Sequence, residues 1–162
     1  MIFIKWLLIS FTLVVIASII AGQLGMFKGK PPTDLGVQDG KLKPPSLTPN
    51  SVSSQAVLYP DHPQLDYAKI EPFPLMGDAS TTLARIRSIV ESMPGAEIIT
   101  SNEHYLYVQF TTRILKFVDD AEFWFDPAAK VIQVRSASRI GRSDLGVNRK
   151  RVETIRAQLG AS

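Results

Sequence analysis

The amino-acid sequence predicts an α+β domain of two layers, preceded by one transmembrane helix and a proline-rich tether. Three observations support this prediction. The chain begins with a long uncharged apolar run, continues through a segment rich in proline, glycine and serine, and ends in a series of amphipathic patterns. Those patterns indicate, in order, a helix, four antiparallel strands and a closing helix, an arrangement typical of a sheet covered by helices.

The apolar run extends from Trp6 to Leu24 without a charge and is about as long as the hydrocarbon core of a bilayer requires. A cleaved signal peptide would share the basic start, here Lys5, and the apolar stretch. The run is long for a signal peptide, however, and Ile19 stands where a small residue is wanted before a cleavage site. We therefore expect a retained transmembrane anchor over residues 1–27.

Lysines lie on both sides of this run, so the positive-inside rule says little about orientation. The very short basic tail before the run resembles a signal anchor whose amino terminus stays in the cytoplasm. The expected location is the cell membrane, single-pass, with the carboxy-terminal domain outside the cytoplasm and the lipid bilayer as a partner.

Residues 28–63 are rich in proline, glycine and serine and show no apolar periodicity. Because prolines remove backbone donors and disfavour helix before them, this segment is predicted to be an extended tether or a docking loop. A disordered spacer fits the segment up to about Pro45. Beyond it, apolar residues could dock on the domain: Val52, Val57, Leu58 and Tyr59.

Residues 64–162 carry the patterns of the domain. A helix is predicted in "DASTTLARIRSIVESMPG", with Asp78 as its N-cap and Pro94 and Gly95 at its end. Strands are predicted in "AEIIT", in "HYLYVQFTTRI" and in the two halves of the hairpin "DDAEFWFDPAAKVIQVRSASRI". The closing helix, "VNRKRVETIRAQL", has one apolar side, formed by Val152, Ile155 and Leu159.

The register of the hairpin follows from its hydrophobic residues, because a slip of one residue would move every side chain to the wrong face. A loop over residues 127–130 places Phe125 opposite Ile132 and Phe123 opposite Val134, all facing the core.

On the outer face the same register places Glu122 opposite Arg135 and Trp124 opposite Gln133. This face could be an aromatic and polar platform for a ligand. We favour a solvated sheet face with one cross-strand ion pair, which is routine in antiparallel sheets.

On the core face the register places Asp119 opposite Ser138 and Ala121 opposite Ser136. A buried carboxylate needs partners, and we expect them to be the serine hydroxyls and the loop amides of residues 141–144. The corner that joins the last strand to the last helix is then a hydrogen-bonded polar knot.

Composition excludes several kinds of chemistry. The chain has no cysteine and only two histidines, which removes disulfides, thiolate metal sites and cysteine nucleophiles and leaves few bases for a Ser-His-Asp arrangement. The net charge of +3 is not that of a nucleic-acid-binding protein. We expect no cofactor and no nucleic-acid partner.

The run "RSASRIGRSDLGVNRKR", Arg135 to Arg151, gathers six basic residues around one aspartate and one asparagine. With the Asp-Asp pair before the preceding strand and the upstream "PNSVSSQ", it resembles the uncharacterised family catalogued as domain of unknown function 1499. The resemblance covers roughly residues 49–159. Family members often have cysteine where this chain has Ser51. The resemblance implies no reaction.

Three interpretations of this corner are open. Arg135, Arg139 and Arg142 could bind a phosphate or lipid head group at the start of the last helix, although Asp144 is expected to cap that helix. An acidic site at Asp119, Asp120 and Asp144 could serve acid–base or divalent-metal chemistry. Neighbouring strand residues point to opposite faces, however, so the first two aspartates do not easily converge.

In the third interpretation the corner is structural, and its residues lock the sheet to the last helix. We favour this interpretation, with a membrane-anchored envelope protein that binds or scaffolds and is not an enzyme. An anionic ligand or a membrane protein would be its partner. No catalytic residue and no metal ligand is assigned. The candidate ligand or polar-knot residues are Asp119, Asp120, Arg135, Ser136, Ser138, Arg139, Gly141, Ser143, Asp144, Asn148 and Arg151.

Overall fold

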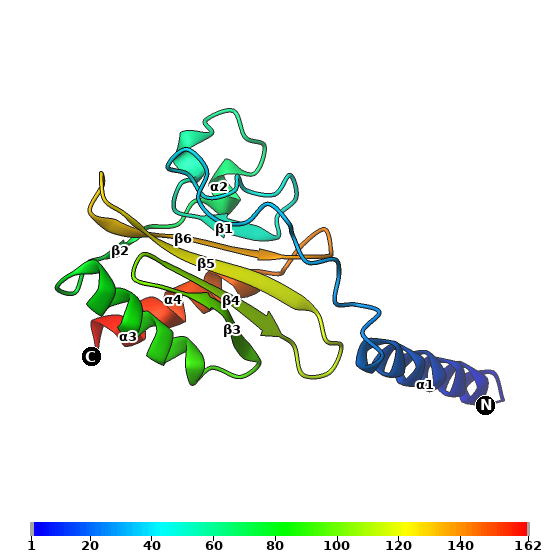
Figure 1. The fold of residues 1–162 in the computed structure, drawn as a ribbon. Coiled ribbons are helices and arrows are strands. Elements are labelled where there is room, and N and C mark those ends of the chain that lie inside the picture. The colour runs from blue at the N-terminus through cyan, green and yellow to red at the C-terminus, as the bar shows by residue number, and fades with distance from the viewer. Residues whose placement is uncertain (1, 162) are drawn as a thin grey trace.

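The computed structural model describes residues 2–161 and has the predicted α+β architecture. Helix α1, Ile2–Gln23, extends away from the rest of the chain as a rod (Figure 1). Within the described residues it is the one helix long and apolar enough to cross a membrane, and a signal sequence would meet the same criteria.

One antiparallel sheet of six strands forms the centre of the domain. Its strands are β1 (Ser51–Ser53), β2 (Phe73–Pro74), β3 (Ala96–Ser101), β4 (Tyr105–Thr111), β5 (Val118–Asp126) and β6 (Val131–Ser138). Their spatial order is β1-β6-β5-β4-β3, and β2 also pairs with β6. Strands β3 to β6 are the four predicted from the sequence, and β1 and β2 are short additions beside the last strand.

Two helices cover one face of this sheet (Figure 1). They are α3 (Ala79–Glu91) and α4 (Val147–Gly160); a 3₁₀ turn, η1 (Ala56–Leu58), and a short helix, α2 (Leu65–Ala68), lie in the preceding connection. The Asp78 side chain accepts a hydrogen bond of 2.6 Å from the Thr81 amide, as expected of an N-cap.

The core lies between these helices and the sheet. It is formed by apolar side chains at the predicted positions of α3, α4 and strands β4, β5 and β6: Leu83, Ile86, Val90, Leu106, Val108, Phe110, Phe123, Ile132, Val134, Val152, Ile155 and Leu159. The hairpin register is also as predicted, with Phe125 opposite Ile132 and Phe123 opposite Val134.

Gly95 lies in the turn between α3 and β3, directly before the strand, at a place that accepts no side chain. Its φ of +76° lies in the left-handed region, and a Cβ there would collide with the Thr111 carbonyl oxygen. We expect Gly95→Ala to lower the free energy of unfolding by at least about 1–2 kcal/mol, the cost of the left-handed conformation alone. Chemical denaturation checks this value, and Gly77→Ala is the matched control, because Gly77 has a similar φ of +98° and open space around its Cβ.

The segment over residues 28–63 lies against the domain along part of its length. Strand β1 pairs with β6, and every residue from Asn50 to Ala56 is buried. Further upstream, Leu42 is also buried, and its amide donates to the Gln55 side chain. The docking function expected of this segment therefore begins before Pro45, within the part that we expected to be a disordered spacer.

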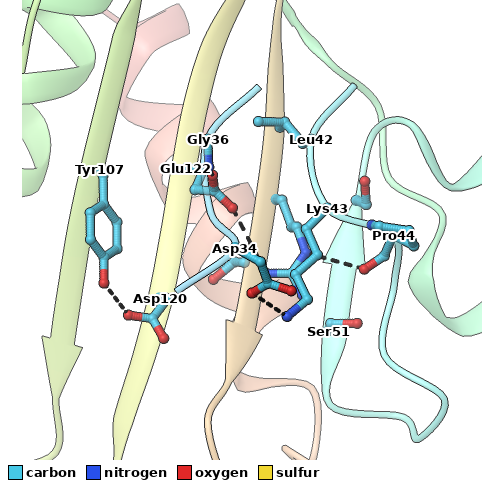
Figure 2. A network of polar contacts seen from close by, with 12 residues as sticks. Asp34, Gly36, Leu42, Lys43, Pro44, Ser51, Tyr107, Asp120 and Glu122 are labelled. Carbon is cyan, nitrogen blue, oxygen red and sulfur yellow. Dashed lines mark hydrogen bonds and ion pairs between the residues drawn. The ribbon is translucent and has the colours of Figure 1, made fainter. Parts of the chain in front are cut away.

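Around Asp120, Glu122 and Arg135 of β5 and β6, the outer face of the sheet, opposite α3 and α4, is not solvated, and that prediction is wrong there. Glu122 is 0% exposed, Arg135 4% and Asp120 3%. Residues 30–46, which we call the covering segment, run across this face (Figure 2). The segment has no apolar periodicity because it contacts the sheet through backbone groups and short polar links.

Candidate functional site

Two networks of buried charges lie back to back on β5 and β6. Asp119 and Asp120 are adjacent on β5 and point to opposite faces, as the strand geometry predicts. Asp119 belongs to the network on the helix side of the sheet, and Asp120 to the network under the covering segment. The three aspartates of the acidic interpretation therefore form no common site.

An arginine–carboxylate pair stands at the centre of the helix-side network. Arg151 of α4 donates to Asp119 Oδ2 at 2.6 Å and to Asn148 Oδ1 at 2.7 Å. Its guanidinium carbon lies 4.4 Å from the centre of the Phe110 ring. The partner of Asp119 is thus Arg151, and not the serine hydroxyls or the loop amides of residues 141–144 that we expected. Arg151 can reach it because residues three apart share one side of a helix, so it lies beside the inward-facing Asn148.

Asn148 connects this pair to the strands and to the chain before β1. Its side-chain nitrogen donates to the Asn50 carbonyl at 3.2 Å, Ser138 Oγ at 3.1 Å and Asp144 Oδ2 at 2.8 Å. Its side-chain oxygen accepts from Ser136 Oγ at 2.6 Å. Asn148 is fully buried, so its side chain holds three parts of the chain at fixed distances.

Asp144 stabilises the start of α4. Its carboxylate accepts from the backbone amides of Asn148 and Gly146, each at 3.0 Å, and from the Tyr67 hydroxyl. Burial opposes ionisation of Asp144, but these hydrogen bonds outweigh it and hold the pKa of the carboxyl below its usual range. The capping function expected of Asp144 is thus visible, and Tyr67 is an additional partner that sequence patterns did not indicate.

The helix-side network fits the polar knot, and the Asp144 carboxylate already accepts from the Gly146 and Asn148 amides that an anion at the start of α4 would use. The network contains Asp119, Ser136, Ser138, Asp144, Asn148 and Arg151. Gly141 adds a carbonyl oxygen that accepts from Asn50 Nδ2 at 2.9 Å. Ser143 is exposed and caps only the following turn, through the Leu145 amide.

On the outer face, Asp120 pairs with Arg139 through two hydrogen bonds. Arg139 Nε lies 2.9 Å from Oδ2 and Nη2 lies 2.8 Å from Oδ1. The Tyr107 hydroxyl donates to Oδ1 at 2.6 Å, and Gln109 donates to that hydroxyl. The carboxylate of Asp120 raises the pKa of Arg139, so this guanidinium stays charged.

Glu122 lies beside this pair and is less completely satisfied. Its Oε1 accepts from the Gly36 amide and from the Tyr105 hydroxyl, each at 2.7 Å. Its Oε2 has no hydrogen-bond partner among the described residues and lies 3.9 Å from Arg135 Nη1. Burial raises the pKa of Glu122, against the effects of Tyr105, Gly36 and Arg135. Burial likewise lowers the pKa of Arg135, against the charge of Glu122.

The covering segment binds this face at a few points (Figure 2). Gly36 donates to Glu122, and the Pro44 carbonyl accepts from Arg135 Nε at 3.4 Å. Within the segment, Lys43 and Asp34 form an ion pair of 2.7 Å. The covering segment therefore lies across a row of buried charged side chains on β5 and β6.

A cleft of about 510 Å³ remains between the covering segment and the sheet. It is lined by residues of the covering segment, the position before β1, strands β5 and β6, and the loop before α4: Lys30, Pro31, Pro32, Thr33, Asp34, Lys43, Pro44, Pro45, Ser46, Asn50, Asp120, Arg135, Ala137, Ser138 and Arg139. Four of these residues are cationic and two are acidic. Asn50 is buried, and its side-chain oxygen has no hydrogen-bond partner among residues 2–161.

The structure thus places the residues suggested by the sequence in two sites, and Ser138 belongs to both. Asp120, Arg135, Ser138 and Arg139 line the cleft, whereas Arg142 is exposed and lies outside its lining. The sequence patterns missed Lys30, Lys43 and Asn50, which come from the segment interpreted as a tether. Only the "PNSVSSQ" motif, which includes Asn50, gave a signal there.

Comparison with known proteins adds the family. Residues 41–159 match the family described as Protein of unknown function (DUF1499). The chain belongs to this family. The match begins within the covering segment and ends at the last core residue of α4. No curated protein and no solved structure shows a significant match to the chain.

Proposed function

We propose that this DUF1499 protein is a membrane-anchored binding protein whose cleft between the covering segment and the sheet takes a small polar ligand with an anionic group. The observation that carries the proposal is the cleft itself, where Arg135 and Arg139 lie beside two lysines of the covering segment. The cleft has the size of a small-molecule site, and convergent polar groups are what orient a ligand in such sites.

Contacts at the carboxyl end of α1 support its retention as the anchor. Gln23 Nε2 donates to the Ile114 carbonyl at 2.8 Å, and Phe27 stacks on Phe117 with 5.5 Å between ring centres. A signal peptide is removed from its protein, whereas these contacts make the end of α1 part of the domain surface. In the proposed orientation the amino terminus is cytoplasmic and the domain lies outside.

The charges of the cleft favour an anion. Lys30 is exposed, so its ammonium group can donate to a ligand. Asp120 accepts from both Arg139 and Tyr107, so Arg139 also keeps N–H donors for a ligand. The unpartnered oxygen of Asn50 would accept from a hydroxyl of the ligand. A phosphate or carboxylate on a small hydroxylated molecule matches these groups, whether it is free or part of a lipid head group.

Binding fits this site better than catalysis. Asp119 is held by Arg151 and Asp120 by Arg139, so neither carboxylate is an available general base. Among the described residues, no group of three or more acidic residues and histidines is placed to hold a metal ion. We therefore propose no reaction for this cleft.

The test is isothermal titration of the full chain in detergent micelles with glycerol 3-phosphate, inorganic phosphate and, as the neutral comparison, glycerol. We expect both phosphates to bind and glycerol not to bind. Lys30→Gln should weaken glycerol 3-phosphate binding about fivefold, which corresponds to about 1 kcal/mol for an exposed charge.

Lys150→Gln is the control of equal charge, because Lys150 is exposed on α4, on the other side of the sheet. Binding to Lys150→Gln should equal binding to the unaltered chain. Equal weakening by both variants would indicate a general charge effect and contradict the proposal, as would the absence of phosphate binding.

A further inference from the structure

The loop between β4 and β5, residues 112–117, is the part of the domain closest to the anchor. Figure 1 shows this end of the sheet beside the carboxyl end of α1, while the β5–β6 turn lies at the other end. Gln23 donates to the carbonyls of Ile114, at 2.8 Å, and Arg113, at 3.4 Å. Gly22 is so close to Leu115 that a Cβ there would lie 2.7 Å from the Leu115 carbonyl oxygen.

These contacts fix the depth of the loop if α1 spans the bilayer. A helix of 22 residues is about 33 Å long, slightly more than the roughly 30 Å of the hydrocarbon core. Gln23 therefore lies at the boundary between acyl chains and head groups. Loop carbonyls that bond its side chain lie at the same depth.

The loop is closed and has an apolar tip. Thr112 and Phe117 bond each other twice, through the Thr112 amide to the Phe117 carbonyl and the Phe117 amide to Thr112 Oγ1, each at 2.9 Å. Ile114 is 58% exposed, and an apolar hollow of about 400 Å³ lies beside it. Leu24 and Met26, directly after α1, are more than two-thirds exposed. Contact with lipid would remove these exposed apolar side chains from water, which is favourable.

Cations surround these apolar residues. Arg113 is exposed in the loop, directly before Ile114. Lys116, two residues after Ile114, is half-buried, and Lys28, after α1, is exposed. Apolar side chains flanked by lysine and arginine are the composition of segments that lie at a membrane interface, where the cations meet anionic lipid phosphates.

We propose that the 112–117 loop is a second membrane contact, which inserts Ile114 at head-group depth and binds anionic lipid through Arg113 and Lys116. This inference rests on the membrane anchoring in the proposed function, and it does not depend on the ligand of the cleft. The domain would then be seated on the bilayer in one orientation instead of swinging on a flexible tether.

The test uses single cysteines, because the chain has none of its own. An environment-sensitive fluorophore is attached to Phe11→Cys in α1, Ile114→Cys in the loop or Ala128→Cys in the β5–β6 turn. The full chain is placed in phosphatidylcholine vesicles with phosphatidylglycerol, and quenching by brominated lipid is measured. Strand β5 separates the second and third positions by about 30 Å.

We expect strong quenching at positions 11 and 114, several-fold above the value at position 128. Gly22→Leu should reduce quenching at position 114 but not at position 11, because it pushes the anchor away from Leu115. Arg113→Gln with Lys116→Gln should reduce it only in vesicles that contain phosphatidylglycerol. Arg113→Cys provides a second probe position if the substitution at Ile114 impairs folding.

Quenching at position 11 without quenching at 114 would overturn the inference and leave the anchor in place. No quenching at either position would overturn the anchor as well. Protection of position 114 from aqueous iodide without lipid quenching would mean that a protein, such as a second copy of the chain, covers the loop, and would also overturn the inference.

Discussion

Arg151→Met should lower the free energy of unfolding by about 3–5 kcal/mol, the range observed when one partner of a buried ion pair is removed. The variant leaves Asp119 as a buried carboxylate without its cation and removes the donors that Arg151 offers to Ser136 and Asn148. It also removes the contact with the Phe110 ring. Urea denaturation of the full chain in micelles, followed by tryptophan fluorescence, measures this loss.

A double-mutant cycle separates the pair from its surroundings. Asp119→Ala with Arg151→Met should be less destabilised than the sum of the two single variants, because neither charge is then left alone. Arg87→Met is the control, since Arg87 pairs with Glu91 on the exposed side of α3 and should change stability by no more than about 0.5 kcal/mol. A loss of that small size for Arg151→Met would contradict a structural function for the helix-side network.

Arg135→Met should produce a loss that depends on pH. At neutral pH we expect about 3 kcal/mol, the lower end of the range for a broken buried pair, because Arg135 and Glu122 approach only to 3.9 Å. The variant leaves Glu122 without the charge that opposes the effect of burial on its pKa, so this pKa rises further above the unfolded value of 4.5.

The direction in which this stability loss changes with pH follows from the linkage between proton binding and folding. A carboxyl whose folded pKa is raised adds stability that is complete below the unfolded pKa and is lost as the pH rises through the folded pKa. The difference between Arg135→Met and the unaltered chain should therefore shrink as the pH falls from neutral toward 4.5. Denaturation curves across this window check the trend. If the difference in the free energy of unfolding stays constant or grows on acidification, ionisation of Glu122 is not the cause of the loss of stability in Arg135→Met.

The sequence predicted well those elements whose residues pack by pattern. Helix α3, strands β3 to β6 and helix α4 repeat apolar residues with the period of their element, and a wrong register would expose Phe123 and Val134. The inward position of Asn148 followed from the same periodicity. Six of the eleven candidate residues do meet in one helix-side network, because a corner between strand and helix brings neighbours in the chain together.

The covering segment could not be predicted in this way. It binds through the Gly36 amide and the Pro44 carbonyl, groups that every sequence possesses and that no side-chain pattern reveals. Gly36 is 86 residues from its partner Glu122, and Pro44 is 91 residues from its partner Arg135. The expectation of a solvated outer face failed for this reason: the pair was identified correctly, but its cover came from a distant part of the chain. The cleft lies between the covering segment and the sheet, so the sequence patterns could not predict it either.

The position of β6 has a consequence for how the protein is made. This strand is the last in the sequence, yet it pairs with β1, β2 and β5 and so joins the two halves of the sheet. Until β6 has been synthesised, the covering segment lacks Arg135, one of the two sheet residues that bind it. Pairing across the sheet is therefore complete only after β6 has been synthesised, so the strands from β1 to β5 cannot form the whole sheet by themselves.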